Sequence, residues 1–215
     1  GRTLNTDMLL CGSMALALFG IWNALEGDEK HKWRSCLIAG VGMGLALLAK
    51  GPVGVAIPLF IAFVYLCVAR RWKQVPWLGV AAALILALVI AGPWYAAANA
   101  REPEFLKQFL GDENLKRFSG GEQYHDPTTP LFYLPVLFVG LLPWTGFLIP
   151  AIAAWWSREA DEARRLRLFL WLWAAIIFAG FSVSSTKLVS YVLPAFPALA
   201  LLVGEGVSRV LDKAN

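Results

Sequence analysis

The stretch Gln74–Ala100, QVPWLGVAAALILALVIAGPWYAAANA, decides the fold, because none of its residues is Asp, Glu, Lys or Arg. A helix needs about 20 apolar residues to cross a bilayer, with a range of about 17–25. The other runs without these residues are Met8–Leu25, Ser35–Ala49, Gly51–Ala69, Pro127–Ser157, Leu168–Thr186 and Leu188–Gly204. Only Ser35–Ala49 falls short of the required length. We therefore predict an all-α, polytopic transmembrane helical bundle of about seven spans.

The composition excludes a soluble globule and a disordered chain. Of the 215 residues, 58% are hydrophobic and 16% are charged, whereas soluble domains contain about 25% charged residues. Disorder requires low hydrophobicity and a high net charge, and the net charge here is only +4. The three cysteines lie inside the apolar runs without CxxC spacing, so they indicate neither a disulfide framework nor a thiolate metal site.

The positions of Lys and Arg orient the predicted spans, because cytoplasmic loops are enriched in these residues. Most of the 19 Lys and Arg residues fall in four short segments, which are 26–34, 70–75, 157–167 and 205–215. We predict that these segments are cytoplasmic, so that the N-terminus lies outside and the C-terminus inside. The charged run 157–167 is expected to be a solvated loop.

The largest hydrophilic segment, 95–130, then falls on the outer side. Pro103 is a favourable helix start, and apolar residues follow it at helical spacing from Phe105 to Leu110. This pattern predicts an amphipathic helix that lies on the membrane surface and covers the spans. Because the chain starts at Gly1 and enters a span almost at once, we interpret residues 1–215 as a single transmembrane domain, a fragment of a longer protein.

Polar residues that could carry chemistry gather on the predicted outer side. They are Asp7, Lys50, Glu113, Arg117, His125, Lys187 and Tyr191. The inner loops are too short for a nucleotide-binding βαβ unit, which needs about 30 residues. An enzyme of this shape would therefore use an activated substrate delivered through the lipid. A lipid-linked phosphate would suit the Lys and Arg side chains.

A series of short motifs runs along almost the whole chain. They are Arg2-Thr3-Leu4-Asn5-Thr6-Asp7-Met8-Leu9-Leu10, Leu48-Ala49-Lys50-Gly51-Pro52, Pro93-Trp94-Tyr95, Glu113-Asn114-Leu115-Lys116-Arg117-Phe118, His125-Asp126-Pro127 leading to Tyr133-Leu134-Pro135, Gly140-Leu141-Leu142-Pro143-Trp144, and Lys187 to Pro197. In this order and spacing they resemble integral-membrane glycosyltransferases of the C-type fold. The resemblance is to bacterial relatives of protein O-mannosyltransferases and of the lipid A aminoarabinose transferase.

The resemblance implies an inverting transfer of a hexosyl or pentosyl unit from a polyprenyl-phosphate donor. The acceptor would be a protein hydroxyl, lipid A or another glycan on the periplasmic side of a bacterial inner membrane. In the family the principal catalytic aspartate lies in the first outer loop, which would precede Gly1. Asp7 resembles the family's second outer-loop aspartate. The expected partners are the donor, a lipid or protein acceptor and membrane lipids, with no nucleic acid.

The resemblance also implies roles for the other polar residues. Those expected to bind the donor's lipid phosphate are Lys50, Arg117, Lys187 and Tyr191. Glu113 and His125 would act in the outer loop, near the acceptor. Lys187 and Tyr191 are four residues apart, which would place them on one helical face. The one cofactor considered is a divalent metal ion bound at Glu113. Some relatives carry a histidine near Asn114 that this chain lacks, which argues against a metal site of the family's type.

Simpler interpretations stay open for several of these residues. Asp7 could cap the N-terminus of its helix, and Lys50 could be a terminal lysine that snorkels to the interface. Two other functions also compete, a transporter or flippase of a lipid-linked substrate and a non-catalytic membrane subunit. Transport favours ionisable groups near the bilayer midplane. Here the charged residues sit at the outer ends of the spans, which favours an enzyme.

Overall fold

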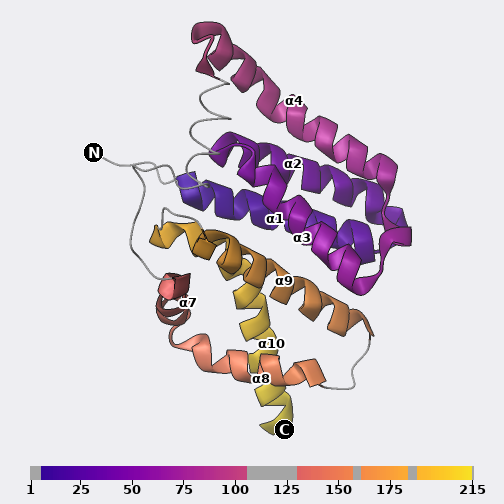
Figure 1. Cartoon of the computed structure of the whole chain (residues 1–215). Coiled ribbons are helices and arrows are strands. Elements are labelled where there is room, and N and C mark those ends of the chain that lie inside the picture. The colour runs from indigo at the N-terminus through magenta and orange to yellow at the C-terminus, as the bar shows by residue number, and fades with distance from the viewer. Residues whose placement is uncertain (1–5, 106–129, 157–160, 184–187, 215) are drawn as a thin grey trace. The chain divides into compact units, whose positions relative to one another are not determined.

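The computed structural model describes residues 6–105, 130–156, 161–183 and 188–214, whose regular structure is entirely helical (Figure 1). The prediction of an all-α fold is thereby confirmed. The chain forms two compact units. The first comprises Gly1–Pro127 with Ser184–Leu188, and the second comprises Thr128–Val183 with Val189–Asn215. The prediction of a single domain stays a prediction.

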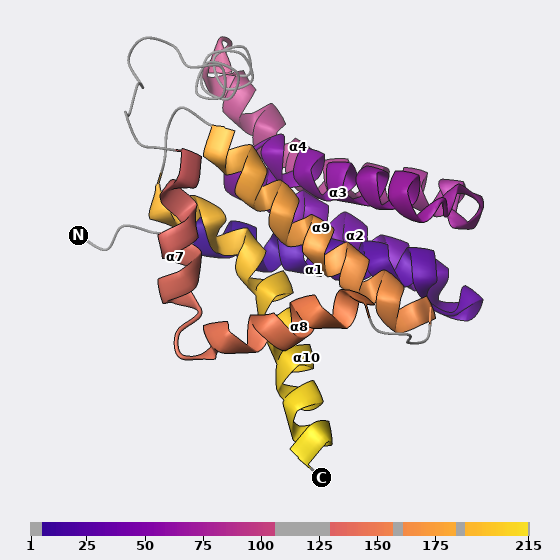
Figure 2. The ribbon, with the colours of Figure 1, turned by 60° about the horizontal axis from the view of Figure 1, so that its bottom comes forward.

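The described part of the first unit has four helices, with α2 in contact with the other three. Its elements are α1 (Thr6–Glu26), η1 (Glu29–His31), α2 (Lys32–Lys50), α3 (Val53–Ala69), η2 (Trp72–Gln74) and α4 (Trp77–Arg101), the two η elements being single 3₁₀ turns. Helix α2 packs against α1, α3 and α4. Because each connection is short, α1 and α2 run antiparallel, and the end of α2 returns to the start of α1 (Figures 1 and 2).

Small residues let these helices approach closely. A Cβ atom added at Gly20 of α1 would lie 2.5 Å from the backbone nitrogen of Ala39 in α2. One added at Gly40 of α2 would lie 2.7 Å from the carbonyl oxygen of Ala83 in α4. Helices in membranes associate through such small-residue contacts, because lipid removes most of the hydrophobic driving force between them. The glycines therefore determine how α1, α2 and α4 pack.

The second unit combines two long helices with several short ones. Its elements are η5 (Pro130–Phe132), α7 (Tyr133–Gly140), η6 (Trp144–Phe147), α8 (Leu148–Ala153), η7 (Ala154–Trp156), α9 (Asp161–Val183), η8 (Val189–Ala195) and α10 (Phe196–Ala214). Helix α10 packs against both α8 and α9, and α8 crosses it (Figure 2). The indole nitrogen of Trp173 in α9 donates a 2.8 Å hydrogen bond to the carbonyl of Pro194, which fixes η8 on α9.

The run 127–157, expected to be one span, is instead bent by 100° between α7 and the segment Trp144–Ala153. Pro143 lacks a backbone N–H and cannot continue the hydrogen bonding of α7. The hydroxyl of Thr145 donates a 3.0 Å hydrogen bond to the carbonyl of Phe138, near the end of that helix. In the described residues, five helices are long and apolar enough to cross a membrane, or six with the bent pair. Seven spans are reached only if α3, with 17 residues, also crosses.

Three predicted boundaries differ from the structure. Helix α4 continues to Arg101, because the small helix-forming residues after Tyr95 extend it into the expected outer loop. Helix α10 continues to Ala214, through the expected C-terminal tail. Helix α9 begins at Asp161, inside the expected loop 157–167. The predicted amphipathic helix of the outer loop lies almost entirely outside the described residues.

The expectation that the charged run 157–167 is solvated is wrong for Arg167. Its side chain is only 1% exposed. The Nε atom of Arg167 donates a 2.9 Å hydrogen bond to Glu205 of α10, and its Nη1 atom donates one to the carbonyl of Ala154. Arg209, one turn further along α10, also donates to Glu205, at 2.8 Å. These partners allow Arg167 to be buried, since a buried charge must be paired.

Candidate functional site

The two charged residues at the start of α1 and the end of α2 form an ion pair. Lys50 Nζ lies 2.5 Å from Asp7 Oδ1 and donates a hydrogen bond to it. The side chains of Asp7 and Lys50 are 12% and 25% exposed, so the pair is largely buried yet still reachable from one side. The structure thus brings together two of the predicted site residues.

The turn after Lys50 fixes the end of α2. Gly51 has a φ of 73°, a left-handed value that glycine adopts without the steric cost of a Cβ. Its backbone N–H donates a 2.8 Å hydrogen bond to the carbonyl of Leu47, which closes the helix. Pro52 then leads directly into α3. The Lys-Gly-Pro motif therefore has a structural role, because it ends one helix, starts the next and leaves Lys50 at the last position of α2.

Tyr95 is a polar residue at the same end of the unit that the candidate list from the sequence omitted. Its hydroxyl donates a 2.9 Å hydrogen bond to the carbonyl of Leu47, one turn before Lys50. Its ring also lies 4.9 Å, between centroids, from that of Trp94 in an edge-to-face arrangement. The Pro93-Trp94-Tyr95 motif carried the only signal that could have identified it.

The described part of the first unit contains none of the other predicted site residues. Those that lie outside the described residues are Glu113, Arg117, His125 and Lys187. Tyr191 belongs to the second unit, where its ring lies 5.4 Å, between centroids, from that of Phe181. It sits in the 3₁₀ segment η8, so the α-helical spacing used to pair it with Lys187 does not apply there.

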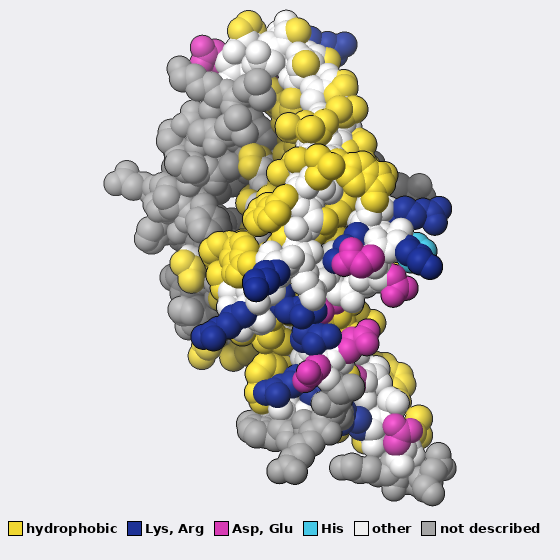
Figure 3. All heavy atoms as spheres, turned by 90° about the vertical axis from the view of Figure 1, so that its right-hand side faces the viewer, with side chains coloured by type: hydrophobic (Ala, Val, Ile, Leu, Met, Phe, Trp, Pro, Cys, Tyr) yellow, Lys and Arg dark blue, Asp and Glu magenta, His cyan; other side chains and the backbone are white. Residues whose placement is uncertain are grey.

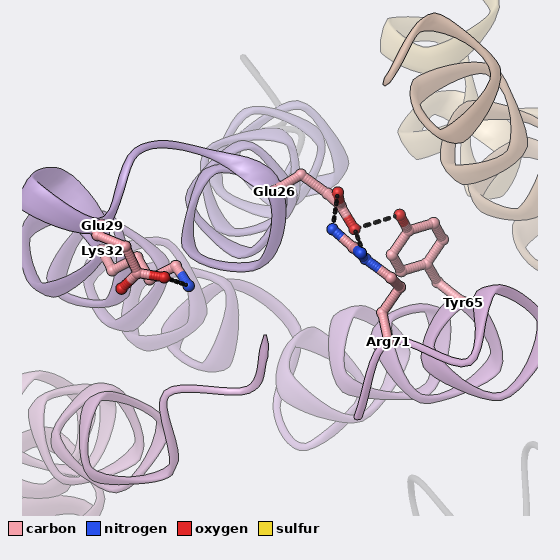
Figure 4. A network of polar contacts seen from close by, with 5 residues as sticks. All are labelled: Glu26, Glu29, Lys32, Tyr65 and Arg71. Carbon is pink, nitrogen blue, oxygen red and sulfur yellow. Dashed lines mark hydrogen bonds and ion pairs between the residues drawn. The ribbon is translucent and has the colours of Figure 1, made fainter. Parts of the chain in front are cut away.

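A second polar network occupies the opposite end of α1 (Figure 4). Arg71 donates two hydrogen bonds of 3.0 Å to the two carboxylate oxygens of Glu26, and the hydroxyl of Tyr65 donates a third of 2.7 Å. The Glu26 side chain is 1% exposed. The hydrogen bond to Glu26 raises the pKa of Arg71 above its ordinary value. This network ties the end of α1 to η2. Beside it, Lys32 pairs with Glu29.

The Asp7–Lys50 pair has the chemistry of an anion site, not of a metal centre. The Lys50 ammonium can neutralise an oxyanion, while the Asp7 carboxylate holds that ammonium in position. Among the residues that the structure describes, no group of three or more His, Cys, Asp or Glu side chains could hold a metal ion. Glu113, the candidate metal ligand from the sequence, lies outside them.

Similarity to known proteins extends over nearly the whole chain. The family model described as dolichyl-phosphate-mannose-protein mannosyltransferase matches residues 1–95. The undecaprenyl phosphate-alpha-4-amino-4-deoxy-L-arabinose arabinosyl transferase of Pseudomonas aeruginosa (strain UCBPP-PA14) is 34% identical over 202 residues, 93% of this chain and 36% of that protein. The enzyme of the same name from Edwardsiella ictaluri is 31% identical and covers 92% of this chain and 35% of its own length.

The fold matches a solved relative as well. The crystal structure of ArnT from Cupriavidus metallidurans bound to undecaprenyl phosphate aligns with a TM-score of 0.82 and 29% identity, covering 95% of this chain and 37% of that one. Its apo structure aligns with a TM-score of 0.78 and 32% identity, again over 95% of this chain and 36% of that one. The chain therefore spans little more than a third of the length of these relatives. It belongs, as a fragment, to the family of integral-membrane glycosyltransferases that includes the protein mannosyltransferases and the aminoarabinose transferase ArnT.

Proposed function

We propose that the whole protein transfers 4-amino-4-deoxy-L-arabinose, a pentosyl unit, from undecaprenyl phosphate to lipid A. The relatives that match over nearly the whole chain carry this donor in their name, and one solved relative holds undecaprenyl phosphate. Of the acceptors expected from the sequence, lipid A is the one that corresponds to the aminoarabinose transferase. The single observation in the structure that supports this function is the Asp7–Lys50 pair, where the end of α2 meets the start of α1.

In the proposed reaction, Lys50 binds the phosphate of the donor and Asp7 positions Lys50. The acceptor hydroxyl attacks the anomeric carbon from the face opposite the phosphate, so the configuration inverts. The new C–O bond forms as the bond to the phosphate oxygen breaks, through an oxocarbenium-like transition state. The hydroxyl proton passes to a carboxylate of the preceding part of the protein, and undecaprenyl phosphate leaves. Lys50 stabilises the charge that develops on that phosphate.

The proposal also orients the membrane-spanning part. The chain starts on the periplasmic side of the bacterial inner membrane, so the Asp7–Lys50 pair faces the periplasm and the Glu26–Arg71 network faces the cytoplasm. The enrichment of Lys and Arg around η1 and η2 supports this orientation. An activated lipid-linked donor can then reach the pair from the outer leaflet.

The test measures sugar transfer to lipid A by the full-length protein reconstituted in liposomes. We expect Lys50→Met to reduce donor turnover about 100-fold, since groups that stabilise developing charge contribute about 10²–10³. Asp7→Asn is expected to reduce it to a similar extent. Asp28→Asn and Lys30→Met, at the opposite end of the unit, remove the same charges and serve as controls.

Two outcomes would contradict the proposal. Turnover equal to that of the controls would remove Asp7 and Lys50 from the reaction. Movement of the intact donor across the bilayer without transfer of its sugar would support the transporter instead. Folding is checked independently by the thermal unfolding of each variant in detergent.

A further inference from the structure

The first unit contains an apolar cavity of about 150 Å³ among α1, α2, α3, η2 and α4. Its wall is formed almost entirely by hydrocarbon and aromatic side chains, with Cys36 contributing the one thiol. Representative lining residues are Ile21, Cys36, Met43, Ala62, Trp72 and Trp77. An apolar cavity of such a size stays dry and accepts an apolar guest. The sequence pattern alone gave no sign of it.

The cavity adjoins a strongly basic end of the unit. Trp72 lines the cavity, and its immediate neighbour Lys73 is exposed, as is Arg70. Neither Lys73 nor Arg70 forms an ion pair within the described part of the chain. Of the nearby acids, Glu26 and Glu29 are engaged by Arg71 and Lys32, and Asp28 lies 3.9 Å from His31. Figure 3 shows Lys and Arg side chains, with Asp, Glu and His side chains among them, next to hydrophobic ones. The mouth of the cavity therefore combines two basic side chains, Arg70 and Lys73, without an ion pair in the described residues, with exposed indoles.

We propose that this cavity binds a segment of one acyl chain of an anionic phospholipid whose phosphate lies against Arg70 and Lys73. The apolar wall suits the acyl chain, and Trp72 and Trp77 suit the level of the headgroups, where indoles are enriched. Exposed Lys and Arg side chains at a membrane surface attract anionic lipids. Charge complementarity thus selects an anionic headgroup over a zwitterionic one.

This lipid is distinct from the proposed sugar donor. The donor's phosphate is assigned to Lys50, at the last residue of α2, whereas the cavity mouth lies near the first turns of that helix. Helix α2 has 19 residues, so its two ends are about 28 Å apart at 1.5 Å per residue. The phospholipid would therefore occupy the leaflet opposite to the donor's phosphate, and its binding does not depend on the proposed function.

The first experiment measures lipid retention by native mass spectrometry of the full-length protein in detergent. Phosphatidylglycerol and phosphatidylcholine with identical acyl chains are added at equal concentrations. We expect one phosphatidylglycerol to be retained preferentially. Arg70→Ala and Lys73→Ala should each weaken its binding about fivefold, the factor for one basic residue near an anionic surface, and leave phosphatidylcholine unaffected. Arg101→Ala, an exposed arginine at the far end of α4, is the matched control and should change neither.

The second experiment tests the cavity itself. Ala62→Phe places a ring in the cavity and should abolish retention of both lipids, whereas Ala81→Phe, on an exposed position of α4, should not. Because Ala62→Phe could also disturb folding, the reactivity of Cys36 provides an independent measurement in a Cys11→Ala/Cys67→Ala background. Phosphatidylglycerol should slow the reaction of Cys36 with a small apolar thiol reagent at least tenfold.

Three results would overturn the proposal. Equal retention of the two lipids by every variant would show that the basic residues select nothing. A Cys36 reaction rate that does not change with phosphatidylglycerol would place the lipid elsewhere. A Cys36 that is unreactive in lipid-free protein, together with no retained lipid, would show that another part of the protein fills the cavity.

Discussion

Asp7 and Lys50 are 43 positions apart in the sequence, yet Lys50 Nζ lies 2.5 Å from Asp7 Oδ1. The antiparallel return of α2 along α1 produces this contact, and Gly51 ends α2 where the contact is made. The ion pair adds a specific partner to both simpler interpretations, a cap for Asp7 and a snorkelling lysine for Lys50, which stay open. Lys50 is directed to a carboxylate, and Asp7, in the first turn of α1, accepts its hydrogen bond.

The Asp7–Lys50 pair predicts non-additive effects on stability. Asp7→Asn or Lys50→Met alone leaves a largely buried charge without its partner, and each should lower the free energy of unfolding by about 1–3 kcal/mol. The double variant should lose less than the sum, because residues in direct contact couple. Thermal unfolding of all four proteins in the same detergent measures the cycle. Strict additivity would mean that the two charges do not interact.

The close packing of α1 on α2 predicts a sharp contrast between two glycines of one helix. Gly20→Ala places a methyl group against the backbone of Ala39 and should destabilise the protein by about 1–3 kcal/mol, as overpacking does. Gly12→Ala is the matched control, since no described atom lies within 4 Å of a Cβ at that position. Unfolding temperatures of the two variants give the comparison. Equal values would contradict the packing of α1 on α2.

The buried arginine of α9 predicts a large loss of stability on removal of its partner. Glu205→Gln leaves the Arg167 guanidinium, which is 1% exposed, without a countercharge and should cost about 3–5 kcal/mol. Arg209→Ala removes a neighbour that is 23% exposed and should cost no more than about 1 kcal/mol. Denaturation of each variant tests this order. A larger effect of Arg209→Ala would show that Arg209, not Arg167, is the essential partner of Glu205.

The Glu26–Arg71 network predicts resistance to alkaline pH. Because its hydrogen bond to Glu26 raises the pKa of Arg71, the stability that its charge contributes is fully present below the ordinary pKa of arginine and is lost only above it. In Arg71→Lys the corresponding loss begins as the pH rises above about 10.4, the ordinary value for lysine. The difference in unfolding temperature between wild type and Arg71→Lys should therefore widen from pH 8 to pH 11.

The exposed neighbour Arg70 supplies the control for this measurement. Arg70→Lys makes the same change of side chain where no ion pair exists within the described residues, so its unfolding temperature should follow that of the wild type at both pH values. A difference that stays constant for Arg71→Lys would show that only the geometry of the guanidinium, and not its charge at high pH, stabilises the network.

The sequence predicted the helical class well because the signal is local. Each of the long runs from Met8–Leu25 to Leu168–Thr186 is apolar enough to identify a helix by itself, and the structure has a helix at each of these positions except across 127–157. The composition could not show that this run bends instead of forming one continuous helix. Pro58 lies inside the continuous helix α3. Pro143, by contrast, coincides with a sharp bend. The difference depends on which groups satisfy the freed backbone, which is a tertiary property.

The candidate site was predictable in part for a similar reason. Asp7 and Lys50 could be proposed because both stand at the ends of apolar runs, and the antiparallel course of two consecutive spans brings such ends together. Tyr95 was missed because its position was assigned to a hydrophilic loop, and the burial of Arg167, which belongs to the second unit and not to the site, was missed for the same reason. Helices α4 and α9 extend over them, and their partners come from other helices. A charge run shows where polar residues are, but not which of them find a partner.

The segment that contains α8 is bent by 100° relative to α7. Whether this bent run crosses the membrane decides on which side of it the C-terminal part lies. A run that passes through the bilayer adds one crossing, whereas one that enters and leaves on the same side adds none. Every later loop and terminus changes side with that single difference, although none of its own residues changes. Sequence drift around Gly140 and Pro143 that straightened or tightened the bend could therefore invert α9 and α10 together.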